Sequence, residues 1–168
     1  MGCGGENGRT GAQPMVNDRQ TKGTNGDERR TVGDEAERRV ARHLVRRGWR
    51  ILDRNWRIGL GEIDIVALDR RTVVFVEVKA LRYPRGSGPE RPVLAVGPNK
   101  RDRLVRLGSA WLAGPGRGMN ARWEEVRFDV VGVEFGRSGV SLEHLEDAFR
   151  PRVSRSGGSA WLRRRGWR

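Results

Sequence analysis

The sequence predicts an α/β domain in which helices cover the faces of a single mixed β-sheet, and three observations support this. Residues 61–68 and 72–79 are rich in β-branched side chains and flank a short charged turn, which is typical of an antiparallel hairpin. Apolar residues recur at helical spacing within 33–47 and 98–113. Another β-branched run occupies 125–133. The predicted order is therefore α-β-β-β-α-β.

The first helix is expected over residues 33–47, because Ala36, Val40 and Leu44 fall on one stripe. Gly48 is a natural stop for this helix. Glu37 lies at the margin of the stripe, so its carboxylate could point along the sheet toward Asp64. A solvated glutamate among the charged residues of the helix surface fits the spacing as well. The next run, 49–57, predicts a strand that leads into a glycine turn.

The hairpin has a defined register if its turn is centred between Arg70 and Arg71. The expected pairs are Leu68 with Val73, Val66 with Phe75, Asp64 with Glu77, and Glu62 with Lys79. One face is then apolar near the turn and charged at its open end. The other face carries only apolar side chains, Ile63 and Ile65 among them, and must be covered by a helix.

The charged end of the hairpin predicts a metal site of the nuclease type. Opposed Cβ atoms lie about 5 Å apart, so Asp64 and Glu77 would repel each other unless a cation lay between them. Mg²⁺ or Mn²⁺ suits such oxygen ligands, and Lys79 on the same face could orient or deprotonate an attacking water. The alternative is that Glu62, Lys79 and their neighbours are ordinary cross-strand charges on a solvated sheet edge.

The charge of the chain is strongly positive, and most of it lies at one end. The net charge is +13 over 168 residues, and residues 150–168 contribute seven arginines with no acidic residue. A basic chain favours polyanions such as nucleic acid, although a genomic bias toward arginine codons would give the same composition. We expect a flexible tail over 1–31, a nuclease-like domain over 32–136 and a basic, flexible C-terminal extension over 137–168.

The composition also indicates the cellular compartment. Cys3 is the only cysteine, so an internal disulfide and a cysteine-based zinc site are excluded, which fits a reducing cytosol. Apolar runs do not reach membrane-spanning length, so no membrane association is expected. The expected location is the cytoplasm. The oligomeric state stays open, with a homodimer as one option.

Basic side chains near the charged end are candidates for nucleic-acid contacts. The candidates are Arg57, Arg82, Lys100 and Arg101 in the domain and Arg163, Arg164 and Arg165 in the extension. For Arg57, a salt bridge to a carboxylate fits equally well. Lys100 and Arg101 open the second helix, where cations oppose the helix dipole, so a role at the site competes with a simple exposed basic face. Two tryptophans interleave with the last arginines and could stack on unpaired bases.

These residues resemble the YraN-like bacterial proteins over roughly residues 32–134. The matching motifs are Glu37 with Arg47-Gly48 behind it, Arg54-Asn55-Trp56-Arg57, Gly61-Glu62-Ile63-Asp64, Phe75-Val76-Glu77-Val78-Lys79, Lys100, and Arg127-Phe128-Asp129-Val130-Val131. The resemblance implies a restriction-endonuclease-like fold shared with archaeal Holliday-junction resolvases. It also implies metal ligands at Asp64 and Glu77, a catalytic lysine at Lys79 and an accessory carboxylate at Glu37.

The sequence departs from the family pattern at two places. Ala36 stands where the family usually has glycine, which is a packing change. Ala80-Leu81 replaces the usual Thr-Arg after the lysine and removes an expected phosphate contact, although Arg82 is adjacent.

The leading functional prediction is a Mg²⁺- or Mn²⁺-dependent endonuclease acting on DNA, with branched or structured DNA as a candidate substrate. The alternative is a non-catalytic nucleic-acid-binding module with a nuclease-like fold. A third interpretation is a scaffold whose tails bind protein.

Overall fold

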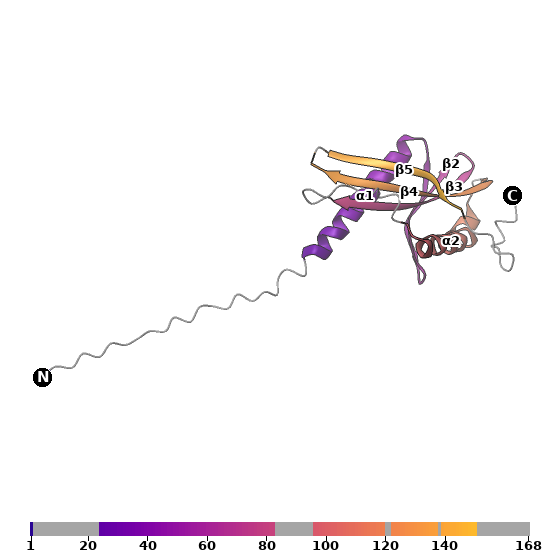
Figure 1. Cartoon of the computed structure of the whole chain (residues 1–168). Helices are drawn as coiled ribbons and strands as arrows, with labels where there is room; N and C mark the ends of the chain where they lie inside the picture. Colours follow the sequence, from indigo (N-terminus) through magenta and orange to yellow (C-terminus); the bar gives the residue numbers. More distant parts are fainter. Residues whose placement is uncertain (2–23, 83–95, 120–121, 138, 151–168) are drawn as a thin grey trace.

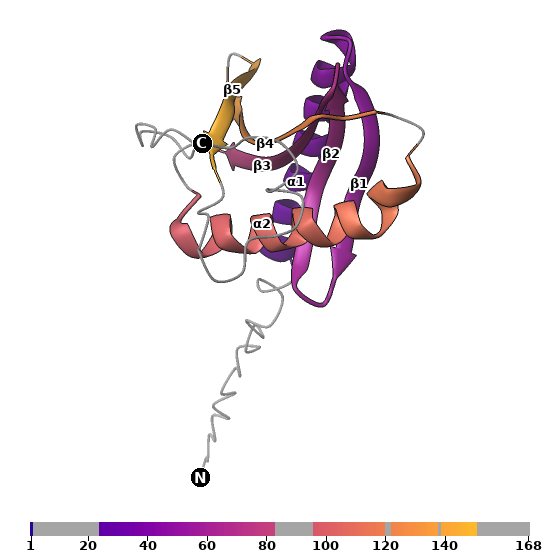
Figure 2. The same ribbon diagram turned by 90° about the vertical axis from the view of Figure 1, so that its right-hand side faces the viewer.

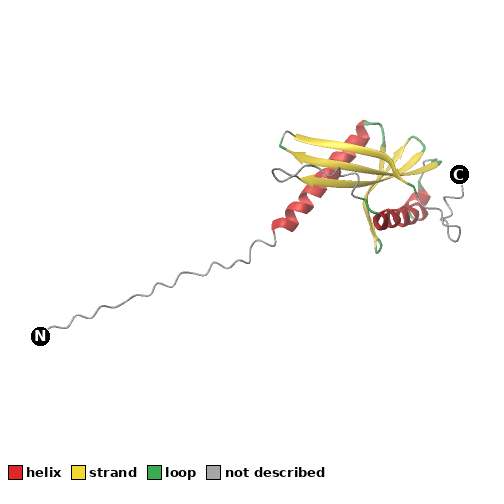
Figure 3. Ribbon diagram, viewed as in Figure 1, coloured by secondary structure: helices red, strands yellow, loops and turns green. Residues whose placement is uncertain are grey.

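The computed structural model describes Met1 and residues 24–82, 96–119, 122–137 and 139–150. Its elements are α1 (Thr24–Arg46), β1 (Arg50–Ile58), β2 (Gly61–Asp69), β3 (Thr72–Arg82), α2 (Pro98–Ala113), the 3-10 helix η2 (Pro115–Gly118), β4 (Glu125–Gly136) and β5 (Gly139–Phe149). The predicted order α-β-β-β-α-β is confirmed, and one further strand follows it (Figure 3).

The five strands form one mixed sheet in the order β1-β2-β3-β4-β5. All neighbours are antiparallel except β3 and β4, which are parallel. A parallel pair requires a crossover connection, and α2 lies in the connection from β3 to β4. The two long helices lie on opposite sides of the sheet (Figures 1 and 2). The predicted fold class is thus confirmed.

One core lies between α1 and the sheet. Ala36, Val40 and Leu44 are fully buried in it, on the stripe that the sequence predicts. The sheet contributes Ile65, Ala67, Val74, Val76, Val131 and Val133. Gly48 ends the helix with a φ of 84°, a conformation that glycine adopts without strain, and its N–H donates to the carbonyl of Val45 at 2.9 Å.

The helix α1 begins at Thr24, nine residues before the predicted start. The described side chains of residues 26–31 are exposed, so no apolar stripe marks them in the sequence. Asp27 in the first turn complements the helix dipole. The helix therefore extends past the sheet that covers its later turns (Figure 1).

A second core lies between α2 and the other face of the sheet. Phe128 stacks on Phe75 and on Phe149, with ring centroids 5.3 and 5.1 Å apart, and Trp111 of α2 meets Phe75 edge-on at 5.9 Å. A Cβ added to Gly108 would lie 2.9 Å from Cε2 of Phe75. Gly108 therefore lets α2 approach the aromatic stack closely.

The hairpin register is confirmed up to Ile65. Val66 lies opposite Phe75 and Leu68 opposite Val73, but the β2–β3 ladder runs no further than Ile65 opposite Val76. The expected pairing of Asp64 with Glu77 is replaced by a hydrogen bond of 2.7 Å, in which the backbone N–H of Val78 donates to Oδ2 of Asp64.

The side-chain alternation of β2 also breaks at Asp64. Ile65 packs in the α1 core as expected, whereas Ile63 packs in the α2 core, which corrects its predicted place beside Ile65. On β1, Trp56 pairs with Ile63, and the residue before it, Asn55, has a φ of 52°. This left-handed residue turns the strand, so Trp56 and Ile63 share the α2 side of the sheet.

The regular elements extend past both domain boundaries expected from the sequence. The helix α1 includes residues 24–31, for which the sequence predicts a flexible tail. The strand β5 pairs with β4 over most of its length and lies within the expected C-terminal extension. Its last residue, Phe149, belongs to the α2 core. The folded unit thus continues to the end of β5.

Candidate functional site

The candidate site lies where β2 and β3 stop pairing, between the two helices. Asp64 comes from β2, Glu77 and Lys79 from β3, Lys100 from α2 and Glu37 from α1. These side chains come from four elements and lie close enough to bond or to influence one another electrostatically. The predicted grouping of Asp64, Glu77 and Lys79 is thus present, and α2 adds a second lysine to it.

Glu77 is the buried centre of this group, with only 3% of its side chain exposed. Its Oε1 accepts from Nζ of Lys79 at 2.7 Å and lies 3.2 Å from Nζ of Lys100. Its Oε2 is buried and has no hydrogen-bond partner among the described residues. Since an unpaired buried oxygen is costly, this atom is poised to bind a further donor or a cation.

Asp64 is the second buried carboxylate, with 8% of its surface exposed. Burial and the neighbouring carboxylate of Glu77 raise its pKa to about 7, against the lowering effect of the Val78 N–H and of Lys100. Lys100 therefore does not offset the cost of ionising Asp64 beside the carboxylate of Glu77. A cation between them would remove that cost.

Glu37 lies beside Asp64, on the α1 side. Burial raises its pKa, and a hydrogen bond from the side chain of Asn55 opposes this effect. The carboxylate of Glu37 adds to the rise of the Asp64 pKa. Of the two expectations for Glu37, the half-buried residue near Asp64 is the one observed. It is Glu35 that binds the surface arginines Arg38 and Arg39.

Asn55 is a site residue that is absent from the candidate site residues predicted from the sequence. It bonds Glu37 and turns β1 at the level of Asp64. Asparagine is among the few residues that tolerate a left-handed backbone, but the need for that backbone appears only once β1 is paired with β2.

A third buried carboxylate, Asp129, shows what a structural role looks like in this fold. Its Oδ1 accepts from Nε of Arg127 at 2.9 Å and from the N–H of Asp147 at 3.0 Å. Its Oδ2 lies 2.8 Å from Nε2 of His144, whose Nδ1 accepts from Arg47 at 3.1 Å. Both oxygens of Asp129 accept hydrogen bonds, and these bonds connect β4 to β5. Glu77 has no such set of donors.

The residues at the site fit a divalent cation. The donors are the carboxylate oxygens of Asp64 and Glu77, one of them without a partner. Within the described residues, no group of three or more His, Cys, Asp or Glu side chains is arranged to hold a metal. Two carboxylates with water in the other positions suit Mg²⁺, which keeps several waters, better than a metal that needs an all-protein cage.

The basic residues predicted to contact nucleic acid differ in the partners that the structure gives them. Arg57 bonds Glu62 at 2.6 Å, which is the salt bridge considered as the alternative. Lys100 faces Glu77, and Arg101 donates to the carbonyl of Val96 at 2.8 Å. The side chain of Arg82 and all of Arg163, Arg164 and Arg165 lie outside the described part of the chain.

The comparisons with known proteins identify the family. The model of the uncharacterised protein family UPF0102 matches residues 36–133. The chain belongs to the UPF0102 family. This is the YraN-like family that the sequence motifs indicated.

Three UPF0102 proteins illustrate the similarity. The relative from Anaeromyxobacter dehalogenans is 42% identical over 127 residues, which is 76% of this chain and 90% of the relative. The relative from Mycobacterium avium is 46% identical over 118 residues, 68% of this chain and 87% of the relative. The relative from Streptomyces griseus is 45% identical over 120 residues, 69% of this chain and 93% of the relative.

Neither helix is suited to crossing a membrane. In the described part of the chain, no helix combines the length and the apolar composition that a transmembrane span requires.

Proposed function

We propose that the protein is a Mg²⁺- or Mn²⁺-dependent endonuclease that cleaves phosphodiester bonds of DNA in the cytoplasm. One observation carries the proposal. Two buried carboxylates, Asp64 and Glu77, converge with Lys79 at the point where two strands separate, and Oε2 of Glu77 has no partner among the described residues. A constellation of this kind suits hydrolysis of a phosphate ester at a metal ion.

Each residue has a distinct role in this proposal. Asp64 and Glu77 hold the cation, which when bound would stabilise the charge that develops on the scissile phosphate. Lys79 is about one-third exposed, at 31%, and can reach both Glu77 and a water that approaches from solvent. Lys100 and Lys79 hold Glu77 in place through Oε1. Glu37 keeps Asn55 and the β1 backbone oriented next to Asp64.

DNA is the proposed substrate because the chain is basic beyond what its acids neutralise, with a net charge of +13. The site is assembled at the open end of the β2–β3 hairpin. The proposed substrates include branched and structured DNA as well as a regular duplex, whose phosphates are also exposed. Four-way junctions, flaps and linear duplexes are therefore the substrates to compare.

The direct test is cleavage of labelled linear, flap and four-way-junction DNA by the purified full chain with Mg²⁺ or Mn²⁺. Cutting by the wild type should be lost in Asp64→Asn and in Glu77→Gln, while Lys79→Ala should lower the rate by about 10²–10⁴. Glu124→Gln is the control, because Glu124 bonds Arg71 at the turn end of the β2–β3 hairpin, away from the site. Nicking that persists in Asp64→Asn would identify a contaminant and refute the assignment.

A non-catalytic nucleic-acid-binding module is the second candidate. It is favoured by the two lysines on Glu77, which supply positive charge to the carboxylate without any metal. Tight, salt-dependent DNA binding by a wild-type protein that cleaves none of these substrates would support it. Cleavage that depends on Asp64 would exclude it.

A further inference from the structure

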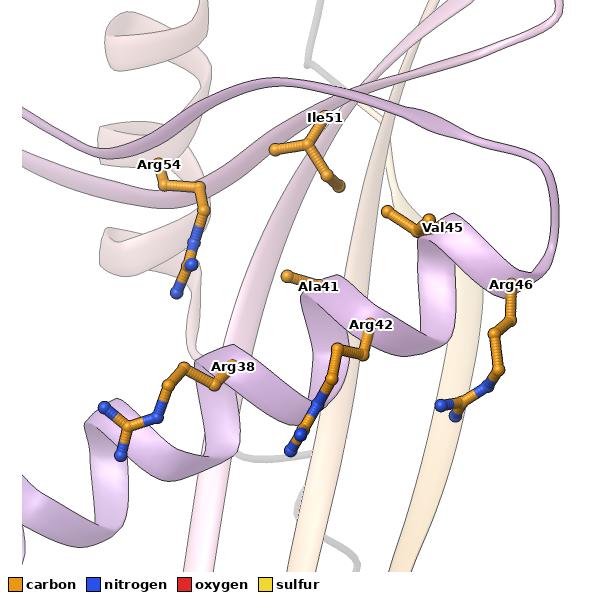
Figure 4. Close-up of a pocket in the computed structure, with 7 residues that line it drawn as sticks. All are labelled: Arg38, Ala41, Arg42, Val45, Arg46, Ile51 and Arg54. Carbon is orange, nitrogen blue, oxygen red and sulfur yellow. The ribbon is translucent and has the colours of Figure 1, made fainter.

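A groove between α1 and β1 is not used by the proposed chemistry. It has a volume of about 610 Å³ and is lined by seven residues. Ala41, Val45 and Ile51 form its apolar floor, and Arg38, Arg42, Arg46 and Arg54 are its other lining residues (Figure 4). Val45 is 56% exposed, so the apolar floor is open to solvent.

The arginines form a regular row because of their spacing. Arg38, Arg42 and Arg46 are four residues apart, which places them along one edge of α1 at steps of about 6 Å. Arg54 reaches toward the helix from β1, on the other side of the floor (Figure 4). A ligand on the floor would have guanidinium groups along both of its sides.

The row carries more positive charge than its surroundings neutralise. Arg38 bonds Glu35 at 3.1 Å, and Arg42 lies 3.7 Å from the same carboxylate, which also binds Arg39. Among the described residues, no salt bridge joins Arg46 or Arg54 to an acid. One glutamate is thus shared by three arginines, and the groove attracts an anion with repeated charges.

The groove is adjacent to the carboxylate site. Arg54 lies close enough to Glu37 to lower its pKa, and Glu37 in turn acts on the pKa of Asp64. Asn55, next to Arg54 on β1, bonds Glu37. A polyanion that follows the arginine row would therefore reach the candidate site through Arg54.

We propose that this groove binds one unpaired strand of the DNA substrate and leads it to the carboxylates. The arginines neutralise successive phosphates, while sugars and bases contact the aliphatic floor. A regular duplex keeps its base faces stacked and would leave the floor without a partner. This inference rests on the proposed function and adds to it a strand-separated substrate with a defined path.

An acidic amphipathic segment of a protein could fill the groove in the same way as a DNA strand. Its carboxylates would bind the arginines, and its apolar stripe would pack on the floor. The position of the groove beside two buried carboxylates and a lysine favours nucleic acid. Binding of an acidic amphipathic peptide, with no measurable affinity for any DNA, would contradict the proposal.

The test is the affinity of the full chain for a fluorescently labelled 20-nucleotide oligothymidylate, measured by anisotropy in EDTA over a range of salt. The variant Arg42→Gln/Arg46→Gln should bind at least several-fold more weakly. The slope of log affinity against log salt should be shallower by about 1.4, since each lost single-strand contact contributes about 0.7. The variant Glu35→Gln should bind more tightly than the wild type.

Two controls distinguish DNA binding in the groove from general electrostatic attraction to a basic protein. Arg117→Gln/Arg122→Gln also removes two positive charges, from exposed residues in and after η2 that do not line the groove, and should leave the affinity unchanged. An abasic oligomer of equal length should bind the wild type more weakly than oligothymidylate does, and Val45→Ser should narrow that difference. Circular dichroism of each variant confirms that α1 is intact.

The outcomes distinguish this inference from the proposed function. Equal affinity and salt slope for the wild type and the groove variant would overturn the inference, even if the protein cleaves DNA. Loss of binding in the groove variant alone would support it, even if no substrate is cleaved. A preference for regular duplex over the unpaired strand would also overturn it.

Discussion

At the scale of single residues, the site is defined by the difference between three buried carboxylates. Asp129 has donors on both oxygens, and Glu77 has donors on one. Asp64 accepts a hydrogen bond from the backbone N–H of Val78, but burial and the carboxylate of Glu77 raise its pKa. Of the three, only Glu77 and Asp64 lie next to each other. A cation bound between them would reduce the energetic cost of burying two neighbouring carboxylates.

The raised pKa of Asp64 makes a prediction for the metal-free protein. Between about pH 4, its ordinary pKa, and its folded pKa of about 7, the native state holds a proton that the unfolded chain has lost. Stability therefore falls as pH rises through this window, and above it the loss caused by Asp64 is complete and no longer changes with pH. The variant Asp64→Asn cannot ionise at this position, so its stability should not fall with pH for this reason.

Urea unfolding of both proteins in EDTA from pH 4.5 to 8 checks this. The free energy of unfolding of Asp64→Asn should exceed that of the wild type by an amount that grows toward pH 7, to at most about 4 kcal/mol. A difference that stays constant with pH would show that Asp64 ionises normally in the folded protein.

At the scale of elements, the two helices contain glycines with opposite roles. Gly33 in α1 has nothing within 4 Å of an added Cβ, whereas Gly108 in α2 has Phe75 at 2.9 Å and Phe128 at 3.2 Å. Alanine is the better helix former at both positions. Only at Gly108 does packing on the aromatic stack oppose it.

The paired substitutions test the close approach of α2 to the sheet. Gly33→Ala should stabilise the protein by about 0.5–1 kcal/mol. Gly108→Ala should destabilise it by about 1–3 kcal/mol through overpacking. Chemical denaturation of the two variants beside the wild type measures both effects, and a stabilising Gly108→Ala would mean that α2 packs less closely than described.

The elements that the sequence predicts well are those whose burial repeats with a fixed period. The register of Val66 with Phe75 follows from strict alternation, and the α1 stripe follows from helical spacing. The first turns of α1 are missed because no buried residue marks them. The break at Asp64 is missed because it depends on Asn55 of another strand.

At the scale of the whole molecule, charge is distributed unevenly. Residues 151–168 contain six arginines and no acid, whereas Arg150, just before them, bonds Asp147 at the end of β5. The arginine groove of α1 and this C-terminal sequence are thus two separate places where we propose that phosphates bind.

Deletion of residues 151–168 should lower the affinity for DNA without removing the site. If these arginines bind phosphates, the slope of log affinity against log salt should become shallower by up to about 5, at about 0.7–0.9 for each contact. Cleavage at saturating substrate should survive, because Asp64, Glu77 and Lys79 lie in the folded part. An unchanged slope would exclude this sequence as a DNA contact.

The sequence alone predicts which carboxylates meet but not how they are held. The spacing on β2 and β3 indicates Asp64, Glu77 and Lys79, because the hairpin brings them to one end of the two strands, just beyond the last pair of Ile65 with Val76. The bond from Lys100 to Glu77 and that from Asn55 to Glu37 join elements far apart in the chain. Such contacts depend on how helices lie across a sheet, which a periodic pattern does not contain.

We propose that Asp64 and Glu77 form a divalent-cation site. Calorimetric titration of the full chain with Mn²⁺ tests it without reference to any substrate. We expect saturable binding by the wild type, no binding by Asp64→Asn or Glu77→Gln, and unchanged binding by Glu124→Gln, whose carboxylate bonds Arg71. Binding that persists in both site variants, or a wild-type protein that takes up no Mn²⁺ or Mg²⁺, would contradict it.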